Sequence, residues 1–482
     1  MSIITRVDLL QNRRTKIIAT IGPASSSEAM LESMITEGVN VFRLNMSHGD
    51  HAGHRQVFES IQTVAARLGR PVAVLADLCG PKIRTGRFRG DGMQLVAGEQ
   101  VIVSVVAEEG GDGIIVSQYE NLARDVGPGD RILLADGLFE LEVIDSTAST
   151  VRCTVIQGGW LGNNKGINLP GVNVSAPSLT EKDHEDAQFA MDLGVDFIAL
   201  SFVRAAGDIL ELKDLIAARG SQARIVAKIE KPEALDNAEA ILDVTDAVMI
   251  ARGDLGVELP PEQVPWAQRQ LINMARVAGI PVIVATQMLE SMISNARPTR
   301  AEVTDVSLAV ESGADAVMLS AETAVGEHVL EAIRMMDRIA RQTEAQLWSS
   351  GEYGRLPIQL KPPIPLWSVI AQSTSRMSRD LMARAVMVVT RSGKSAEIAA
   401  TARPASPVVA MTHDPAVCRK LCLHWGVVPV LDDAVGTENP NELVRLRAIE
   451  MGLAVEGQYV LLVRGFHGEG QRNLPSVTVV EV

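Results

Sequence analysis

The stretch Ala247-Val248-Met249-Ile250-Ala251-Arg252-Gly253-Asp254 is a short apolar run that ends directly in charged residues and a glycine. Other short apolar runs in the chain also end in small polar clusters. They are Lys16–Ile21, Val39–Leu44, Val72–Ala76, Phe197–Leu200, Ile225–Ala227, Pro281–Ala285 and Ala316–Leu319. A series of such runs predicts a (β/α)8 barrel, in which chemistry gathers at the carboxyl ends of the strands because the loops vary there while the body stays packed.

The residues that follow these runs are of the types that bind a metal ion and an anion. They include Asn45-Met46-Ser47-His48, Asp77, Ser201, Lys228-Ile229-Glu230, Arg252-Gly253-Asp254, Thr286-Gln287 and Ser320-Ala321-Glu322. Carboxylates are the ligands that Mg²⁺ prefers, and a lysine can neutralise a developing oxyanion. The pattern therefore predicts Mg²⁺-assisted chemistry on an anionic substrate.

Length, charge and cysteine content limit the classes of protein to which the chain can belong. A chain of 482 residues is too long for one core and predicts about two to four domains. Its net charge of −14 disfavours a nucleic-acid surface, which needs a basic face. No apolar run approaches the roughly 18 residues that span a bilayer, and no signal-peptide core is present, so we expect a cytoplasmic protein without a membrane partner. Four cysteines do not make a disulfide framework here, and we expect buried free thiols.

The β/α rhythm is interrupted once and then resumes, which predicts three domains. Short alternating stretches separated by glycine turns fill residues 79–176 and predict a small β-barrel inserted as a lid. Residues 1–78 and 177–350 would form the catalytic barrel. A Pro/Gly-rich linker, Gly351–Pro365, then leads into renewed β/α alternation, so residues 351–482 are expected to form an open α/β domain.

Each chemical motif is ambiguous when it is taken alone. Lys228 and Glu230 fall on the same side of an extended strand end, yet this tripeptide alone favours an exposed ion pair. Arg252-Gly253-Asp254 permits close backbone approach to an anion, or is a simple turn from strand to helix. Thr286 can place a hydroxyl over a substrate or cap a helix. The motifs become specific only in combination.

In combination, six segments closely resemble the pyruvate kinase family in order and spacing. They are Val41–Gly49, Gly80–Gly86, Lys165–Gly171, Ala227–Glu230, Met249–Glu258 and Ala285–Met292. The resemblance covers essentially the whole chain and includes the insert and the C-terminal region. It implies transfer of the phosphoryl group of phosphoenolpyruvate to ADP, giving pyruvate and ATP, which is the final step of glycolysis. It also implies a bacterial-type enzyme and a homotetramer.

The resemblance further implies a role for each matched residue. Glu230 and Asp254 would hold Mg²⁺, with Mn²⁺ able to substitute, and Lys228 would stabilise the phosphoryl transition state and the enolate oxygen. Substrate would be held by Arg43, Gly253, Asp254, Thr286 and Ser320, with Ser320 and Glu322 acting as supports behind the contacts. Arg43, Arg84 and Thr286 join Lys228 as catalytic residues, and ADP or ATP would be bound by His48, Arg84 and Lys165. The nearby His51 and His54 are expected to be solvated.

The monovalent-cation pocket departs from the family pattern. Its matched ligands are Asn45, Ser47, Asp77 and the carbonyl of Leu78. Family members that use K⁺ typically carry Glu at the position of Lys82 and Thr at that of Leu78. An ammonium from Lys82 could supply the positive charge of K⁺, so we expect activity without K⁺. A solvated loop lysine is the alternative.

The loop Arg391-Ser392-Gly393-Lys394-Ser395 precedes a predicted helix and resembles a phosphate cradle. An ordinary capped helix start would explain this motif equally well. The family resemblance favours a phosphorylated effector bound by Thr390, Ser392, Lys394 and Ser395. The segment Arg464–Gly470 would close over it, and the acidic Glu469 disfavours a second phosphate pocket. We therefore expect a sugar monophosphate or AMP as the activator.

Two other functions share part of the pattern. A barrel lyase that acts through a metal enolate would use Lys228 and the carboxylates but would not need Arg84 and Lys165. A sugar-phosphate sensor would use only the C-terminal domain and would not need the intact residues of the metal site. The sequence does not indicate which group donates the final proton to the enolate.

Overall fold

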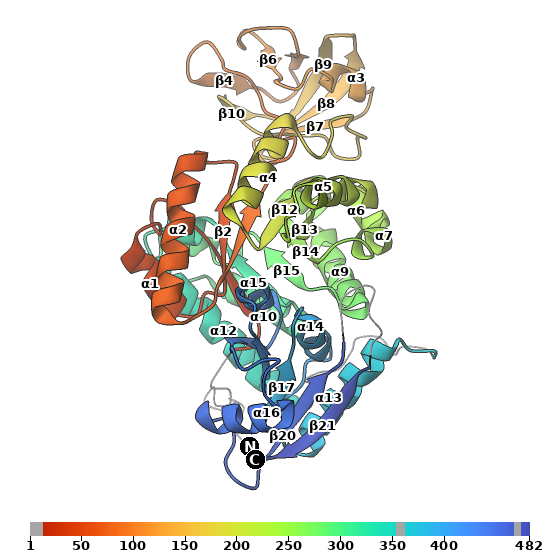
Figure 1. The fold of residues 1–482 in the computed structure, drawn as a ribbon. Helices are drawn as coiled ribbons and strands as arrows, with labels where there is room; N and C mark the ends of the chain where they lie inside the picture. Colours follow the sequence, from red (N-terminus) through yellow and green to blue (C-terminus); the bar gives the residue numbers. More distant parts are fainter. Residues whose placement is uncertain (1–12, 353–361, 467–473) are drawn as a thin grey trace.

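The computed structural model describes residues 13–352, 362–466 and 474–482. The chain is elongated, with a β-rich insert at one end, a β/α barrel in the middle and an α/β domain at the other end (Figure 1). Within these ranges no helix is both long enough and apolar enough to cross a membrane. The predicted linker Gly351–Pro365 and closing segment Arg464–Gly470 extend beyond the described residues. The domain limits drawn from the sequence stay a prediction.

Eight parallel strands close the central barrel in the order β1-β16-β15-β14-β13-β12-β3-β2. Their bounds are β1 (Lys16–Thr20), β2 (Val41–Asn45), β3 (Ala73–Asp77), β12 (Phe197–Leu200), β13 (Arg224–Ile229), β14 (Ala247–Ala251), β15 (Val282–Ala285) and β16 (Ala316–Leu319). Alternate strand residues such as Ile18, Phe197 and Met249 fill the barrel, and the others pack against the helices. The predicted (β/α)8 fold is confirmed.

Helices and short helical turns surround the barrel. They are α1 (Glu28–Thr36), α2 (His51–Leu68), α4 (Glu181–Leu193), α5 (Ala206–Ala218), α6 (Pro232–Asp236), α7 (Ala238–Leu242), α8 (Arg252–Glu258), η2 (Pro261–Gln263), α9 (Val264–Ala278), η3 (Glu290–Ile293), α10 (Arg300–Ser312), α11 (Ala321–Ala324) and α12 (Val329–Ser350). Thr180 caps α4 in a capping box with Asp183. The Asp50 side chain caps the start of α2 by accepting the Gly53 amide.

The insert is all β, apart from the short helix α3 (Leu122–Asp125), but its strands pair as two sheets rather than one closed barrel. The six-stranded sheet has the order β11-β7-β8-β9-β5-β6, and the other sheet pairs β10 with β4. Bounds are β4 (Gly92–Leu95), β5 (Gln100–Ser104), β6 (Ile114–Val116), β7 (Arg131–Leu134), β8 (Phe139–Ser146), β9 (Thr150–Gln157), β10 (Gly159–Gly162) and β11 (Ile167–Asn168). The chain changes sheets at Gly158, where a Cβ would stand 2.3 Å from the Leu95 carbonyl oxygen. Both sheets share one hydrophobic core.

The C-terminal domain is an open sheet of order β19-β18-β17-β20-β21 with helices on both faces, as predicted. Its strands are β17 (Val386–Val389), β18 (Val408–Thr412), β19 (Val427–Leu431), β20 (Tyr459–Arg464) and the antiparallel β21 (Ser476–Glu481). Its helices are α13 (Leu366–Asp380), α14 (Lys394–Thr401), α15 (Pro415–Lys420) and α16 (Pro440–Glu450), with the turn η4 (Leu421–Leu423).

The C-terminal domain closes the amino-terminal end of the barrel. Leu423 and Cys422 of η4 pack with the side chains that fill the barrel interior, and the Cys422 thiol donates to the Pro71 carbonyl just before β3. All four cysteines are free, and three of them are buried. The opposite, carboxyl-terminal end of the barrel faces the insert, so the barrel has the C-terminal domain at one end and the insert at the other (Figure 1).

Candidate active site

Charged side chains from separate strands meet at the carboxyl end of the barrel. Lys228, near the end of β13, directs its Nζ to Glu230 Oε1 at 2.8 Å and to Asp77 Oδ1 of β3 at 3.2 Å. The same ammonium donates to the Ser201 Oγ at 2.6 Å. Lys228 and Glu230 therefore lie on one side of the strand end, as the two-residue period of a strand requires. Asp77 and Ser201 complete the cluster from neighbouring strands.

Lys228 is held as a fixed cation. Burial alone would lower the pKa of its ammonium, but the carboxylates of Asp77 and Glu230 more than offset burial and raise that pKa above its usual value. Burial likewise opposes ionisation of Asp77, yet Lys228 and Arg43 keep the pKa of that carboxyl below its usual value. The Arg43 Nε contributes a 2.6 Å ion pair to Asp77. Lys228 therefore supplies positive charge and cannot serve as a general base near neutral pH.

Asp254 supplies a second carboxylate beside Glu230. It lies in the first turn of α8, directly after β14, and Glu230 follows the adjacent strand β13. Burial, then the negative charge of Glu230, raises the pKa of Asp254 to about 6. In the ranges that the structure describes, no hydrogen bond or ion pair engages the Asp254 carboxylate. A cation between the two acids would relieve their repulsion.

This pair of carboxylates suits Mg²⁺. Glu230 is 2% exposed, and its Oε2 accepts the Phe202 amide at 2.9 Å, so its orientation is fixed. Among the described residues no group of three or more His, Cys, Asp or Glu side chains gathers into a metal site. Mg²⁺ commonly uses one or two carboxylates and takes its remaining ligands from water and substrate phosphate. The residues present therefore fit a metal that bridges protein and substrate.

Thr286 and Gly253 are in contact with each other. The Thr286 hydroxyl donates to the Ala285 carbonyl at 2.6 Å and accepts the Gly253 amide at 2.7 Å. A Cβ on Gly253 would stand 3.3 Å from this hydroxyl oxygen, which favours glycine there. The Gly253 amide is therefore occupied by Thr286 and the Thr286 hydroxyl proton by Ala285, so both hydrogen bonds must break before these two predicted donors can reach a ligand.

Arg252 is a site residue that the sequence reasoning missed. Its Nη1 pairs with Asp305 at 2.5 Å, and its Nη2 donates to the Thr286 carbonyl at 2.8 Å. Thr286 and Gln287 both have left-handed backbone angles, with φ of 68° and 54°. Such angles are costly outside glycine and persist only where surrounding contacts hold them. Arg252 is one of those contacts, and no local sequence signal identifies Asp305 as its partner.

The remaining predicted phosphate contacts fall into two places. Arg43 lies in the barrel cluster, where its Nη1 also donates to Thr20 Oγ1 at 3.1 Å. Arg84 and Lys165 lie side by side on the insert, joined by backbone bonds through Thr85 and by a bridge from Arg84 to Gly166. In the described ranges no hydrogen bond or ion pair links either insert side chain to the barrel cluster.

Ser320 and Glu322 lie behind the end of β16. The Ser320 amide donates to Glu322 Oε2 at 2.7 Å, and Oε1 of the same buried carboxylate accepts the Leu289 amide at 3.1 Å. Burial raises the pKa of Glu322 above its usual value. Glu322 thus joins two βα loops, which is the geometry of a supporting residue.

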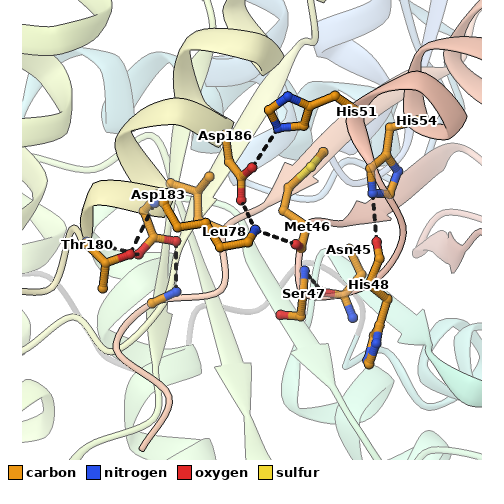
Figure 2. Close-up of polar contacts among 12 residues, drawn as sticks. Asn45, Met46, Ser47, His48, His51, His54, Leu78, Thr180, Asp183 and Asp186 are labelled. Carbon is orange, nitrogen blue, oxygen red and sulfur yellow. Dashed lines mark hydrogen bonds and ion pairs between the residues drawn. The ribbon is translucent and has the colours of Figure 1, made fainter. Parts of the chain in front are cut away.

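The predicted monovalent-cation ligands line the ends of β2 and β3, but in the described part of the chain no hydrogen bond or ion pair joins Lys82 to them. The Asn45 side-chain oxygen Oδ1 accepts the Ser47 amide at 3.2 Å (Figure 2). The Leu78 carbonyl accepts the Ser201 hydroxyl at 2.7 Å. The cations in contact with Asp77 are Arg43 and Lys228, whereas Lys82 lines a pocket with Asp254 and lowers the pKa of that residue.

The predicted effector loop borders a cavity of about 940 Å³ in the C-terminal domain. The lining includes Thr390, Ser392 and Ser395, together with Arg391, His413 and Arg464. Lys394 departs from the prediction. It pairs with Glu397 at 3.5 Å and lines a neighbouring cavity of about 250 Å³. The i,i+3 carboxylate on the same helix competes for the lysine, and the sequence pattern did not reveal this competition.

The fold and the site together define a β/α-barrel enzyme that acts on an anionic substrate. A family model described as pyruvate kinase, barrel domain, matches residues 12–333, and a model described as pyruvate kinase, alpha/beta domain, matches residues 368–478. The pyruvate kinase of Sporosarcina psychrophila is 42% identical over 481 residues, covering 97% of this chain and 80% of that protein. The pyruvate kinase of Mycobacterium intracellulare is 43% identical over 458 residues, covering 94% and 95%.

A solved structure agrees with these relatives. The crystal structure of a pyruvate kinase from Cryptosporidium parvum superimposes with a TM-score of 0.90 at 35% identity, covering 97% of this chain and 96% of that chain. The chain belongs to the pyruvate kinase family and is a phosphotransferase. The family predicted from the six segments is confirmed.

Proposed function

We propose that this chain transfers the phosphoryl group of phosphoenolpyruvate to ADP, giving pyruvate and ATP, in a Mg²⁺-dependent reaction. The observation that carries the proposal is the fixed ammonium of Lys228 beside Glu230, 2.8 Å away, at the carboxyl end of the barrel. The matched relatives, which carry the name pyruvate kinase, support it. The bond between phosphorus and the enol oxygen breaks, a bond to a β-phosphate oxygen of ADP forms, and the enolate takes up a proton.

Glu230 and Asp254 are the residues that would hold Mg²⁺, or Mn²⁺ in its place. When bound, the metal neutralises charge on the substrate oxygens as the phosphoryl group moves. Lys228 would stabilise the same charge from the protein side, because it is buried, protonated and oriented by Asp77 and Ser201. Arg43 would bind phosphate with its guanidinium while Asp77 holds its Nε. The amides of Gly253 and Asp254 and the hydroxyl of Thr286 would hold the substrate.

Arg84 and Lys165 would approach the nucleotide phosphates from the insert, with His48 on the barrel side. A contact between the insert and the barrel already exists near this place. Asn168 of β11 donates to Glu258 Oε1 at 3.2 Å, and Lys231 pairs with the same oxygen at 2.7 Å. Further closure of the insert would bring its cations to the barrel end and exclude water.

Regulation and assembly complete the proposal. The 940 Å³ cavity would bind a phosphorylated activator such as a sugar monophosphate or AMP, through hydroxyls and the nearby arginines. K⁺ would not be required, because the basic residues Arg43 and Lys228 already contact the Asp77 carboxylate. We also propose a homotetramer and a cytoplasmic location.

A coupled assay with phosphoenolpyruvate, ADP and Mg²⁺ tests the proposed reaction. We expect pyruvate and ATP to form in equal amounts, and neither to form when ADP or the divalent metal is omitted. Pyruvate released without ADP would mean that the phosphoryl group passes to water, which would contradict the kinase, and no turnover would favour the lyase or the sensor.

A further inference from the structure

The turn between β2 and α2, residues 46–50, is tied down at several points. The Met46 amide donates to the Asp77 carbonyl at 3.0 Å. Across the turn, a ring nitrogen of His54 lies 2.9 Å from the His48 carbonyl oxygen (Figure 2). The His48 imidazole itself points away from the His54 ring (Figure 2). The backbone of the turn is therefore held, while among the described residues no hydrogen bond or ion pair engages the predicted nucleotide-binding side chain of His48.

Helix α4 supplies two further attachments to this turn, and both involve one carboxylate. Lys182 donates to the Met46 carbonyl at 2.9 Å and pairs with Asp186 Oδ2 at 2.5 Å. The other carboxylate oxygen, Asp186 Oδ1, lies 2.8 Å from Nε2 of His51, the first residue of α2 (Figure 2). The His51 ring also stacks on Phe189 of α4 at 4.0 Å. His51 is therefore engaged at its edge and on its face, rather than simply solvated as expected.

The two members of the Lys182–Asp186 ion pair differ sharply in exposure. The Asp186 side chain is 4% exposed, whereas that of Lys182 is 56% exposed. An ordinary exposed pair of this i,i+4 type contributes little to stability. Here the buried Asp186 carboxylate contacts both ends of the turn. It pairs with Lys182, which binds the Met46 carbonyl at the beginning of the turn, and it contacts His51 just after the end. Contacts at both ends of a short segment fix the position of that segment, even where they add little to the stability of the protein.

The same turn of α4 holds the entry to the insert. Asp183, which is fully buried, accepts the Gly80 amide at 2.9 Å. Its other oxygen receives the amide and hydroxyl of Thr180. The amino-terminal end of α4 thus contacts both the entry to the insert and the β2–α2 turn.

We propose that Lys182 and Asp186 are positioning residues for the nucleotide, which fix the β2–α2 turn against α4 so that His48 meets ADP in the correct place. The inference rests on the proposed role of His48 in nucleotide binding. Neither residue touches substrate. Their loss would displace the turn, and small displacements at phosphoryl-transfer sites weaken binding of the group that they orient.

The first test compares three lysine variants. Lys182→Met removes both donations, Lys182→Arg keeps a cation at the same place, and Lys213→Met removes an exposed lysine of α5 as a matched control. We expect Lys182→Met to raise the KM for ADP about tenfold while the KM for phosphoenolpyruvate changes less than about twofold. Lys182→Arg should recover most of the loss, and Lys213→Met should match wild type. Any other pattern overturns the positioning role of Lys182.

The second test is a double-mutant cycle with His48. If Asp186 acts through the turn, Asp186→Asn raises the KM for ADP in wild type but adds less than about twofold in a His48→Ala background. Full additivity overturns the inference, and melting temperatures exclude general unfolding as the cause. If His48→Ala alone leaves the KM for ADP unchanged, the proposed nucleotide role of His48 fails instead. The two failures are therefore distinguishable.

Discussion

Replacing Gly80 by alanine perturbs the entry to the insert at a point of close packing. Gly80 has φ of +67°, and a Cβ there would stand 2.6 Å from Phe202 Cδ2 and 2.9 Å from Ser201 Cβ. Gly69, at the end of α2, has a similar φ of +61° with nothing within 4 Å of its Cβ position. Gly69→Ala therefore carries only the left-handed backbone cost, whereas Gly80→Ala carries that cost and a steric clash.

The magnitudes follow from these two terms. The left-handed conformation costs about 1–2 kcal/mol for a residue with a side chain, and overpacking adds about 1–3 kcal/mol. Gly69→Ala should lower the free energy of unfolding by about 1–2 kcal/mol, and Gly80→Ala by about 2–5 kcal/mol. The clash also displaces Ser201, which accepts a 2.6 Å hydrogen bond from Lys228. Gly80→Ala should therefore lower kcat about tenfold or more.

Urea denaturation followed by circular dichroism gives the stabilities, and the coupled assay gives kcat. Gly69→Ala serves as the control, with kcat near wild type. The reasoning is refuted if the two variants lose equal stability, or if Gly80→Ala retains full kcat despite the larger loss of stability.

Three further predictions concern cations, the effector and pH. Activity should be the same in K⁺ and in tetramethylammonium at equal ionic strength, and strong activation by K⁺ would contradict this. At sub-saturating phosphoenolpyruvate, Ser392→Ala should raise the concentration of a sugar monophosphate needed for activation about tenfold. Lys394→Ala should raise that concentration less, because the Lys394 side chain lines a neighbouring cavity. Equal potency of the sugar monophosphate in wild type and both variants would contradict the site. Burial, opposed by Glu397 and reinforced by Arg224, lowers the pKa of His424 to about 4 from 6.5. Because the unfolded chain binds the proton more readily, the free energy of unfolding should fall by about 2–3 kcal/mol as pH drops from 6.5 to 4. His424→Gln should not show this pH-dependent loss of stability. An equal dependence on pH in His424→Gln and wild type would contradict the prediction.

Local patterns predicted the barrel because strands, caps and turns depend on neighbouring residues. The side shared by Lys228 and Glu230 follows from strand periodicity, and the cap at Thr180 depends only on Asp183, three residues further along. Whether the strands of the insert form one closed barrel was less predictable, because two short sheets and one closed barrel have the same alternation of apolar and polar residues. The close approach of Gly158 to Leu95 marks one of the places where the chain passes between the sheets, from β9 to β10.

Long-range partners explain what the sequence could not show. Asp186 lies 135 residues from His51, and no local pattern pairs them. Glu397, which holds Lys394 away from the predicted cradle, is itself paired with Arg224 of β13 at 2.5 Å. The packing of the C-terminal domain against the barrel creates that pair, so a motif on one domain does not reveal it.

The central claim is that Lys228 stabilises the transition state while Glu230 and Asp254 hold the metal. The most direct measurement is kcat for Lys228→Met alongside the dissociation constants for phosphoenolpyruvate and Mg²⁺, with Glu230→Ala and Asp254→Ala measured in parallel. We predict that Lys228→Met lowers kcat by about 10³-fold and changes both dissociation constants only slightly. The two carboxylate variants should also weaken Mg²⁺ binding. A folded Lys228→Met enzyme with near-normal kcat would contradict the account.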